Sequence, residues 1–198
     1  MRTPFLLFAA PLLAFSISCQ NMDALNYLKA VKDGRLHFAD GSALDIPHWD
    51  DPAWTHFFCV RHAEKEDHEP YDPGLSTEGE ARAEHLGRIM AEAGLNAVYS
   101  SPSRRAKLTA EPVQRRGHTA PVLEYEPGDQ EEWLLELLPK SRGKKIMIIG
   151  HQNTIPHLLN QLNGGGFDFD NIPNYDFGKI FVVATKGIGE TEVIELRY

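Results

Sequence analysis

The 198-residue sequence has only two cysteines, Cys19 and Cys59, and no excess of basic residues. Two cysteines cannot form the framework of several disulfides that holds small secreted domains together. Lys and Arg number 20 against 28 Asp and Glu, which gives a formal net charge of -8. Because nucleic-acid binding depends on clustered Lys and Arg, this charge argues against nucleic acid as a partner. An anionic ligand would have to be held by a few local residues.

The sequence also lacks internal repeats and the paired His or Cys spacing that marks a metal site. Its nine His residues are scattered, and none forms a pair at the short spacing that zinc ligands share. We therefore expect no metal ion and no other cofactor.

The longest continuous apolar run lies near the N-terminus, over residues 5–15, and it is too short to span a bilayer as a helix. Arg2 precedes the run and small residues follow it, so residues 1–19 are predicted to be a signal peptide. The segment Ser16-Ile17-Ser18-Cys19 resembles a bacterial lipobox, although Ser16 replaces the usual Leu. Two outcomes stay open: a membrane-anchored lipoprotein with a lipid on Cys19, or cleavage that releases a soluble periplasmic protein.

The rest of the chain is long enough for one well-buried core and short for two. Residues 20–54 are predicted to be an N-terminal arm. Within the arm, Asp40-Gly41 separates the apolar pieces 36–38 and 43–46, a pattern typical of a short hairpin. Residues 55–198 form the main domain.

Apolar runs in this main domain alternate with segments of helical periodicity. Ala83, Leu86, Met90 and Ala93 are spaced for one helix face, and so are Ile155, Leu158, Leu159 and Leu162. Strand-like runs lie at 57–60, 97–99, 122–123, 146–149, 181–183 and 193–194. Unbroken apolar strands between helices indicate a sheet that is covered on both faces. We predict an α/β fold, a three-layer α/β/α sandwich with a mostly parallel central sheet.

Residues suited to phosphate follow three of these strands. Arg61-His62 follows the run at 57–60, Arg104-Arg105 lies a few residues after the run at 97–99, and His151 follows the run at 146–149. Ligands of open α/β sheets bind beyond the carboxyl ends of the strands. A guanidinium fork matches two phosphate oxygens, and a neutral imidazole can attack phosphorus. Asn153, just before the helix that contains Pro156, would add free backbone N–H groups.

These residues resemble the histidine phosphatase superfamily, also called phosphoglycerate mutase-like. The resemblance spans about residues 55–185 and rests on four motifs in order: Arg61-His62-Ala63-Glu64, Leu75-Ser76-Thr77-Glu78-Gly79, Ser100-Ser101-Pro102 with Arg105 to Ala110, and Gly150-His151. It implies that His62 is the phosphorylated nucleophile, that Arg61, Arg105 and His151 bind the phosphate, and that no metal takes part. Neighbouring helical residues point about 100° apart, so Arg104 and Arg105 cannot share one phosphate, and the motif spacing selects Arg105.

The acid that protonates the leaving oxygen is not identified by the resemblance. In the acid phosphatase branch an Asp follows the second His, but Gln152 stands there in this sequence. The mutase-like branch places a Glu after the third strand, which makes Glu126 the first choice. Asp129, which also suits a helix cap, and Glu64 are rivals. A site without such an acid would favour leaving groups that need little protonation.

We predict a metal-independent phosphatase that hydrolyses a small phosphorylated substrate through a phosphohistidine. One alternative is a phosphoglycerate mutase-like phosphotransferase or a phosphohistidine protein phosphatase. The other is an exported phosphate-binding protein with weak catalysis. The short stretch at residues 125–130 offers little to retain a phosphorylated product, which favours hydrolysis over return transfer. The sequence identifies neither the substrate nor the oligomeric state.

Overall fold

The computed structural model describes residues 27–68, 70–118, 121–166 and 168–198. The predicted signal peptide, with Cys19, lies outside the described residues. None of the described helices is both long and apolar enough to cross a membrane.

The main domain is built on a six-stranded sheet in the order β6-β5-β7-β4-β8-β9. Its strands are β4 (Thr55–Arg61), β5 (Ala97–Ser100), β6 (Leu123–Glu124), β7 (Lys145–Gly150), β8 (Lys179–Gly187) and β9 (Glu190–Arg197). Strands β6, β5, β7 and β4 pair in parallel, whereas β8 is antiparallel to both β4 and β9. Only β8 therefore runs against the others, and the predicted mostly parallel sheet is confirmed.

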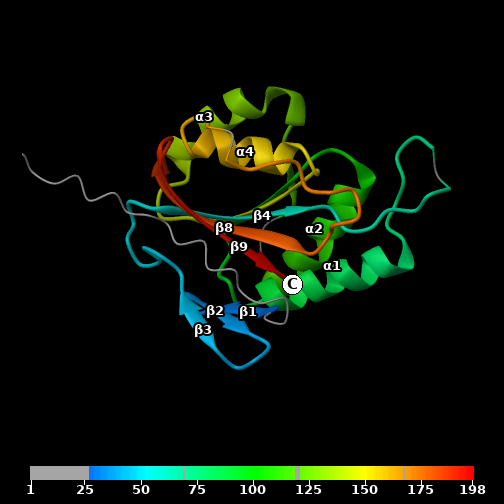
Figure 1. Cartoon of the computed structure of the whole chain (residues 1–198), viewed down its shortest axis with the longest axis horizontal. Helices are drawn as coiled ribbons and strands as arrows, with labels where there is room; N and C mark the ends of the chain where they lie inside the picture. The colour runs from blue at the N-terminus through cyan, green and yellow to red at the C-terminus, as the bar shows by residue number, and fades with distance from the viewer. Residues whose placement is uncertain (1–26, 69, 119–120, 167) are drawn as a thin grey trace, which may run out of the picture.

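Helices cover both faces of the sheet, as the α/β/α prediction requires (Figure 1). One face carries α1 (Thr77–Met90) and α2 (Arg104–Gly117), and the other carries α3 (Gln130–Lys140), preceded by the short helix η1 (Pro127–Asp129), and α4 (Thr154–Leu162). Strand β4 is buried along its whole length because its side chains alternate between two cores. Phe57 and Cys59 pack with α3 and α4, and Phe58 and Val60 pack on the opposite side.

The N-terminal segment forms a second, three-stranded sheet in the order β1-β2-β3. Its strands are β1 (Leu28–Lys32), β2 (Arg35–Phe38) and β3 (Ala43–Asp45), and β2 pairs antiparallel with β3 around Asp40-Gly41. Leu28, Leu36 and Phe38 belong to the same apolar cluster as Ile180 and Leu196 of β8 and β9. Figure 1 shows this small sheet on the same side of the central sheet as α1. The segment therefore completes a core layer and does not extend as a separate arm.

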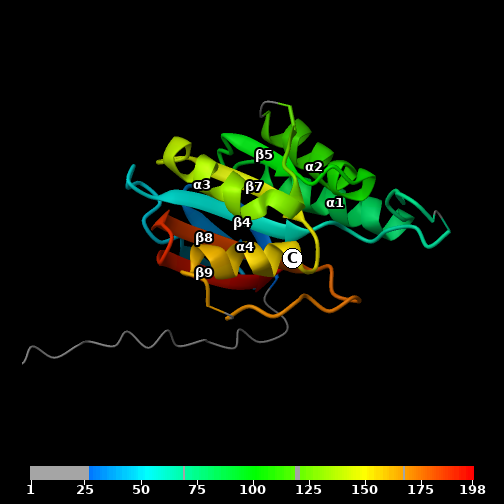
Figure 2. The same ribbon diagram turned by 90° about the horizontal axis from the view of Figure 1, so that it is seen from above.

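The parallel strands bring the three predicted junctions together at one edge. Arg61 pairs with Gly150 across β4 and β7, and the His62 amide donates to the Gly150 carbonyl at 2.9 Å. The Ser101 amide donates to the Ile149 carbonyl at 3.1 Å. Seen from above (Figure 2), the segment after β4 and the segment before β8 both project past the carboxyl end of β4.

Candidate active site

A cleft of about 940 Å³ opens at the carboxyl ends of β4 and β7. Five of the six predicted site residues line it, and four of these five are basic or imidazole side chains: Arg61, His62, Arg105 and His151. Asn153 lines it as well. The remaining lining residues are Glu64, Lys65, Asp67, Pro70, Pro73, Ser76, Glu78, Gln152, Asn174 and Phe177.

His62 is held in one tautomer by its two ring contacts. Nδ1 lies 2.7 Å from the carbonyl of Ala63, and Arg105 Nε donates to Nε2 at 3.0 Å. Because the carbonyl can only accept and the guanidinium can only donate, Nδ1 carries the proton and Nε2 carries the lone pair. The lone pair faces Arg105 in the cleft, which is the arrangement that a nucleophilic imidazole needs.

Both imidazoles are kept neutral by burial and by the nearby guanidinium groups. Burial lowers the pKa of His62 to about 3, with further lowering from Arg105, His151 and Arg61. Burial also lowers the pKa of His151 to about 4, and Arg105 and Arg61 add to this effect. His62 is therefore unprotonated at neutral pH, as attack on phosphorus requires.

Arg105 reaches the cleft from the first turn of α2, and its helix is tied directly to the loop after β4. The buried Thr109 hydroxyl accepts from the Ala63 amide at 3.0 Å and donates to the Arg105 carbonyl at 2.7 Å. This contact fixes the distance between His62 and Arg105. Arg105 Nη2 also lies 3.4 Å from His151 Nδ1, so one guanidinium touches both imidazoles.

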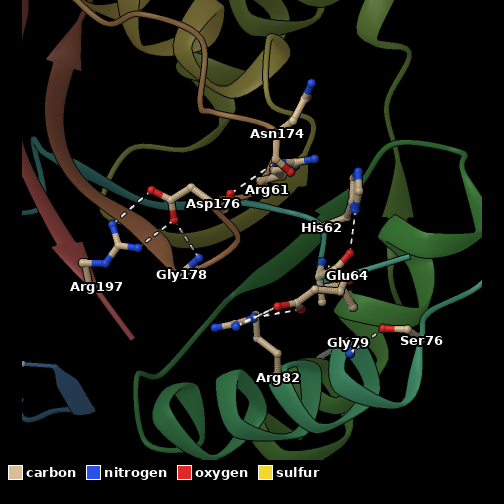
Figure 3. A network of polar contacts seen from close by, with 12 residues as sticks. Arg61, His62, Glu64, Ser76, Gly79, Arg82, Asn174, Asp176, Gly178 and Arg197 are labelled. Atoms are coloured by element: carbon tan, nitrogen blue, oxygen red, sulfur yellow. Dashed lines mark hydrogen bonds and ion pairs between the residues drawn. The ribbon is translucent and has the colours of Figure 1, made fainter. Parts of the chain in front are cut away.

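Arg61 is buried and anchored by the segment that precedes β8. Its Nη1 donates to the carbonyls of Pro173, Asn174 and Asp176 at 2.9, 3.1 and 3.2 Å. Its guanidinium carbon lies 4.0 Å from the centre of the Phe177 ring, a favourable cation–π distance. Figure 3 shows that Asp176 in turn binds Arg197 and the Gly178 amide. The segment 173–178 is thus shaped around Arg61.

His151 is positioned by hydroxyl groups. Its Nε2 lies 2.8 Å from the Ser101 Oγ, and its amide donates to the Thr154 Oγ1 at 2.9 Å. The ring centres of His151 and His62 are 5.3 Å apart. Asn153 is the N-cap residue of α4, and its side chain makes no capping hydrogen bond. The N-terminus of α4 therefore faces the same cleft as the two imidazoles.

The three carboxylates considered for the acid lie in different places. Glu64 lines the cleft, but Arg82 holds it through contacts of 2.7 to 2.9 Å (Figure 3). Glu126 immediately precedes η1 and Asp129 is its last residue; both are exposed, and neither is among the residues that line the cleft. Asp67 and Glu78 line the cleft and are exposed. In the described part of the chain, no carboxylate bonds to a ring nitrogen of His62 or His151.

Several residues of the site were not predicted from the sequence. Ser101 and Thr109 lie inside the motif Ser100-Ser101-Pro102 with Arg105 to Ala110, which pointed to their neighbourhood, but no role was predicted for either residue. Asp176 and Phe177 lie in a segment without any motif, and only the fold places them against Arg61. Within the described ranges, no three His, Cys, Asp or Glu side chains are placed to hold a metal ion. Metal-free chemistry stays a prediction.

The family model of the histidine phosphatase superfamily (branch 1) matches residues 57–127, which contain His62 and Arg105. Over these residues the chain is similar to that superfamily. No curated protein sequence matches it.

Several solved structures, phosphatases among them, share its fold. The protein histidine phosphatase SixA, complexed with tungstate, is 17% identical with a TM-score of 0.59, and the match covers 72% of this chain and 96% of SixA. Bacillus stearothermophilus YhfR is 19% identical with a TM-score of 0.59, over 70% of this chain and 95% of YhfR. Phosphoserine phosphatase of Entamoeba histolytica, complexed with 3-phosphoglyceric acid, is 16% identical with a TM-score of 0.57, over 73% and 97% of the two chains.

Proposed function

We propose that this chain is a phosphatase that hydrolyses phosphomonoesters, without a metal ion, through a phosphohistidine on His62. The observation that supports the proposal most is the fixed tautomer of His62, whose Nε2 lone pair faces Arg105 at 3.0 Å. Arg105, Arg61 and the N-terminus of α4 provide donors for the phosphate oxygens.

The first chemical step transfers the phosphoryl group to His62. Nε2 forms a bond to phosphorus, the bond from phosphorus to the leaving oxygen breaks, and that oxygen departs with the electron pair. The imidazole ring gains positive charge, which the Ala63 carbonyl stabilises through Nδ1–H at 2.7 Å. Arg105 touches both imidazoles, so it can donate to the equatorial oxygens as their charge grows.

Water completes the reaction. Its oxygen attacks phosphorus, the bond to Nε2 breaks, and the electron pair returns to the imidazole. The two protons of the water end on the released alcohol and on the hydrogen phosphate, so one ester and one water give one alcohol and one phosphate.

The test is hydrolysis of p-nitrophenyl phosphate by the purified protein in EDTA, beside His62→Ala. Exchange of the exposed His157 for Ala is the matched control. We expect activity in the wild type and in the control, and a loss of at least 1,000-fold in His62→Ala, as for removal of a nucleophile. Equal inactivity of wild type and His62→Ala from pH 4 to 8, also on natural phosphoesters, would favour a binding protein instead. Activity that EDTA abolishes would contradict metal independence.

A phosphohistidine protein phosphatase is the second candidate. It is favoured by the placement of two carboxylates that were candidates for the general acid. Glu64 is held by Arg82 and Glu126 lies away from the cleft, so neither is placed to protonate a leaving oxygen. Release of a phosphoryl group from imidazole demands less acid assistance than release from an alkyl alcohol. Dephosphorylation of a phosphohistidine protein at least 100-fold faster than of any phosphomonoester would select this candidate.

We also infer export, on the basis of residues 1–19. Cell fractionation and labelling with a radioactive fatty acid test this inference. Label that disappears in Cys19→Ala identifies a membrane-anchored lipoprotein, and unlabelled protein in the periplasm identifies ordinary cleavage. Full-length protein in the cytoplasm contradicts both.

A further inference from the structure

The two imidazoles of the cleft face one edge of a single guanidinium. Arg105 Nε donates to His62 Nε2 at 3.0 Å, and Arg105 Nη2, on the same edge of the fork, lies 3.4 Å from His151 Nδ1. All three residues line the cleft. Because a guanidinium nitrogen can only donate, each of these two ring nitrogens carries a lone pair. His151 Nδ1 is therefore unprotonated, like His62 Nε2.

The other ring nitrogen of His151 gives its proton to a serine. A neutral imidazole has one N–H, so Nε2 carries it and donates to Ser101 Oγ at 2.8 Å. The Ser101 hydroxyl then donates to Ser103 Oγ at 3.1 Å. Ser101 is fully buried, and its amide donates to the Ile149 carbonyl at 3.1 Å. A fixed hydroxyl thus selects the tautomer of His151.

Neither imidazole has an N–H left to offer a phosphate. His62 donates from Nδ1 to the Ala63 carbonyl at 2.7 Å, and His151 donates from Nε2 to Ser101. A phosphate dianion would place an oxygen lone pair against the Nδ1 lone pair of His151, with no proton between them. A monoanion has a P–O–H group that can donate to Nδ1, and it keeps two unprotonated oxygens for guanidinium groups. The tautomers therefore favour a phosphate that brings one proton.

The charges around His151 determine where that proton comes from. Burial lowers the pKa of His151 to about 4, and Arg105 and Arg61 add to this effect, so water does not protonate the ring at neutral pH. The ring centre of His62, 5.3 Å away, belongs to a group that is neutral as well. Four other charged residues line the cleft, and in the described part of the chain none bonds to a ring nitrogen of His151: Glu64, Lys65, Asp67 and Glu78. A bound phosphate offsets the charge of the two arginines and brings its own proton.

We propose that the site binds phosphomonoesters as monoanions, with the phosphate O–H donating to Nδ1 of His151, and that Ser101 is the positioning residue that keeps Nδ1 unprotonated. This inference rests on the proposed function and deepens it. It names the protonation state of the substrate and a source, other than a carboxylic acid, for the proton of the leaving group.

The protons balance over the two chemical steps. His62 Nε2 bonds to phosphorus, the bond to the leaving oxygen breaks with its electron pair on that oxygen, and the oxygen takes up the proton that the phosphate brought. Water then attacks phosphorus, the bond to Nε2 breaks with its electron pair returned to the ring, and both water protons stay on the dihydrogen phosphate. For a dianionic ester, the alcohol would have to take its proton from water instead.

Nitrogen NMR of the ¹⁵N-labelled full chain reads the tautomers without any turnover. At pH 8.5 we expect His151 to be protonated on Nε2 and unprotonated on Nδ1, with its signals assigned by their loss in His151→Gln. Inorganic phosphate should then move the Nδ1 signal of His151 towards the protonated value, while His62 Nε2 stays unprotonated. A proton on His151 Nδ1 before phosphate is added, or a phosphate-dependent proton on His62, overturns the inference.

Calorimetry counts the protons that accompany binding. Free phosphate is mostly a dianion at pH 8.5 and a monoanion at pH 5.5, and the heats of binding in two buffers of different ionisation enthalpy give the number of protons taken up. We expect about half a proton or more per phosphate bound at pH 8.5, and close to none at pH 5.5. The affinity for phosphate should fall as the pH rises between these values.

Ser101→Ala separates a positioning role from a structural one. Without the hydroxyl, Nε2–H has no acceptor, so the ring can carry its proton on Nδ1 and donate to the dianion directly. Proton uptake at pH 8.5 should fall below half of the wild-type value while phosphate still binds. A merely structural effect would weaken binding at both pH values and leave the uptake per phosphate unchanged. Ser42→Ala, which removes an exposed hydroxyl between β2 and β3, is the matched control and keeps the wild-type uptake.

Absence of proton uptake in the wild type at pH 8.5 overturns the inference, and so does uptake that Ser101→Ala leaves unchanged. If Ser101→Ala does not fold, the tautomer of His151 and the proton count of the wild type decide. Uptake at His151 in a protein that hydrolyses no phosphoester sinks the proposed function and leaves this inference standing. Hydrolysis through His62 without proton uptake does the reverse.

Discussion

At the level of single residues, the phosphate pocket depends on which of two neighbouring arginines enters it. Arg105 Nε lies 3.0 Å from His62 Nε2, whereas the Arg104 guanidinium lies beside Gly74. Loss of one preorganised donor costs about 100- to 1,000-fold in rate. We expect Arg105→Lys to lower kcat/KM by about 100-fold, because a lysine cannot reproduce the guanidinium contacts with both imidazoles. The kcat/KM of the matched control, Arg104→Lys, should stay within threefold of the wild-type value. Equal losses of kcat/KM in the two variants, measured in steady-state assays, would contradict the assignment of Arg105 to the phosphate pocket.

The lowered pKa of His62 makes the folded protein sensitive to acid. The pKa is about 3 in the folded state against 6.5 for a free imidazole, so the unfolded state binds a proton first as the pH falls. Stability is therefore lost as pH drops below about 6.5, by about 2 kcal/mol for His62 alone at pH 5. Urea unfolding at pH 7 and pH 5 should show a smaller loss in His62→Asn than in the wild type. An equal loss of stability between pH 7 and pH 5 in the two proteins would mean that His62 is not held neutral.

Residues at strand ends could be predicted, and residues held by the fold could not. His62, Arg105 and His151 were found because parallel strands end at one edge, a rule that needs no coordinates. Glu126 was chosen by its place after a strand, but β6 comprises only Leu123–Glu124, and Glu126 itself is exposed. Asp176 comes close to Arg61 only because β8 returns antiparallel beside β4, and no local pattern encodes that contact.

At the level of elements, α1 lies so close to the loop after β4 that one of its positions must be glycine. A Cβ on Gly79 would come within 2.0 Å of the Glu64 carbonyl oxygen. This oxygen already accepts from the Ser76 amide at 3.0 Å, so it cannot move without loss. The contact between α1 and the Glu64 backbone therefore sets the shape of the loop that carries His62.

Gly79→Ala should lower the free energy of unfolding by about 3 kcal/mol. This value is at the upper end of the range that is usual for overpacked side chains, because the backbone has to shift to make room for the Cβ. Gly128→Ala is the matched control, since its Cβ would meet no atom within 4 Å. Chemical unfolding measures both variants. A change below 1 kcal/mol for Gly79→Ala would contradict the close approach.

Most elements of the central sheet could be predicted because their apolar runs are unbroken and end at polar residues. Strand β4 is buried at every position and β7 at all but its first, so both stood out in the sequence. The N-terminal strands were harder to interpret. Only alternate residues of β2 face the core, and a short half-buried hairpin resembles one on a free arm.

At the level of the whole molecule, the small N-terminal sheet shares one core with the domain that carries the cleft. Leu36 is fully buried, and Leu44, its neighbour across the β2–β3 pair, is 41% exposed. We expect Leu36→Ala to lower the free energy of unfolding by about 3 kcal/mol and Leu44→Ala by less than 1 kcal/mol. Thermal or urea unfolding measures the difference. Equal, small effects would mean that the sheet is not part of the core.

The phosphoryl group on His62 is the central claim, and covalent labelling tests it most directly. The protein is mixed with a ³²P-labelled phosphomonoester, quenched, and mapped by mass spectrometry. A phosphohistidine is labile in acid and stable in base, unlike a phosphoserine. We predict label on the peptide that contains Arg61-His62-Ala63, with this lability, and its absence in His62→Ala. Label of the same lability that persists in His62→Ala, or label on another residue, would contradict the assignment of His62 as the nucleophile.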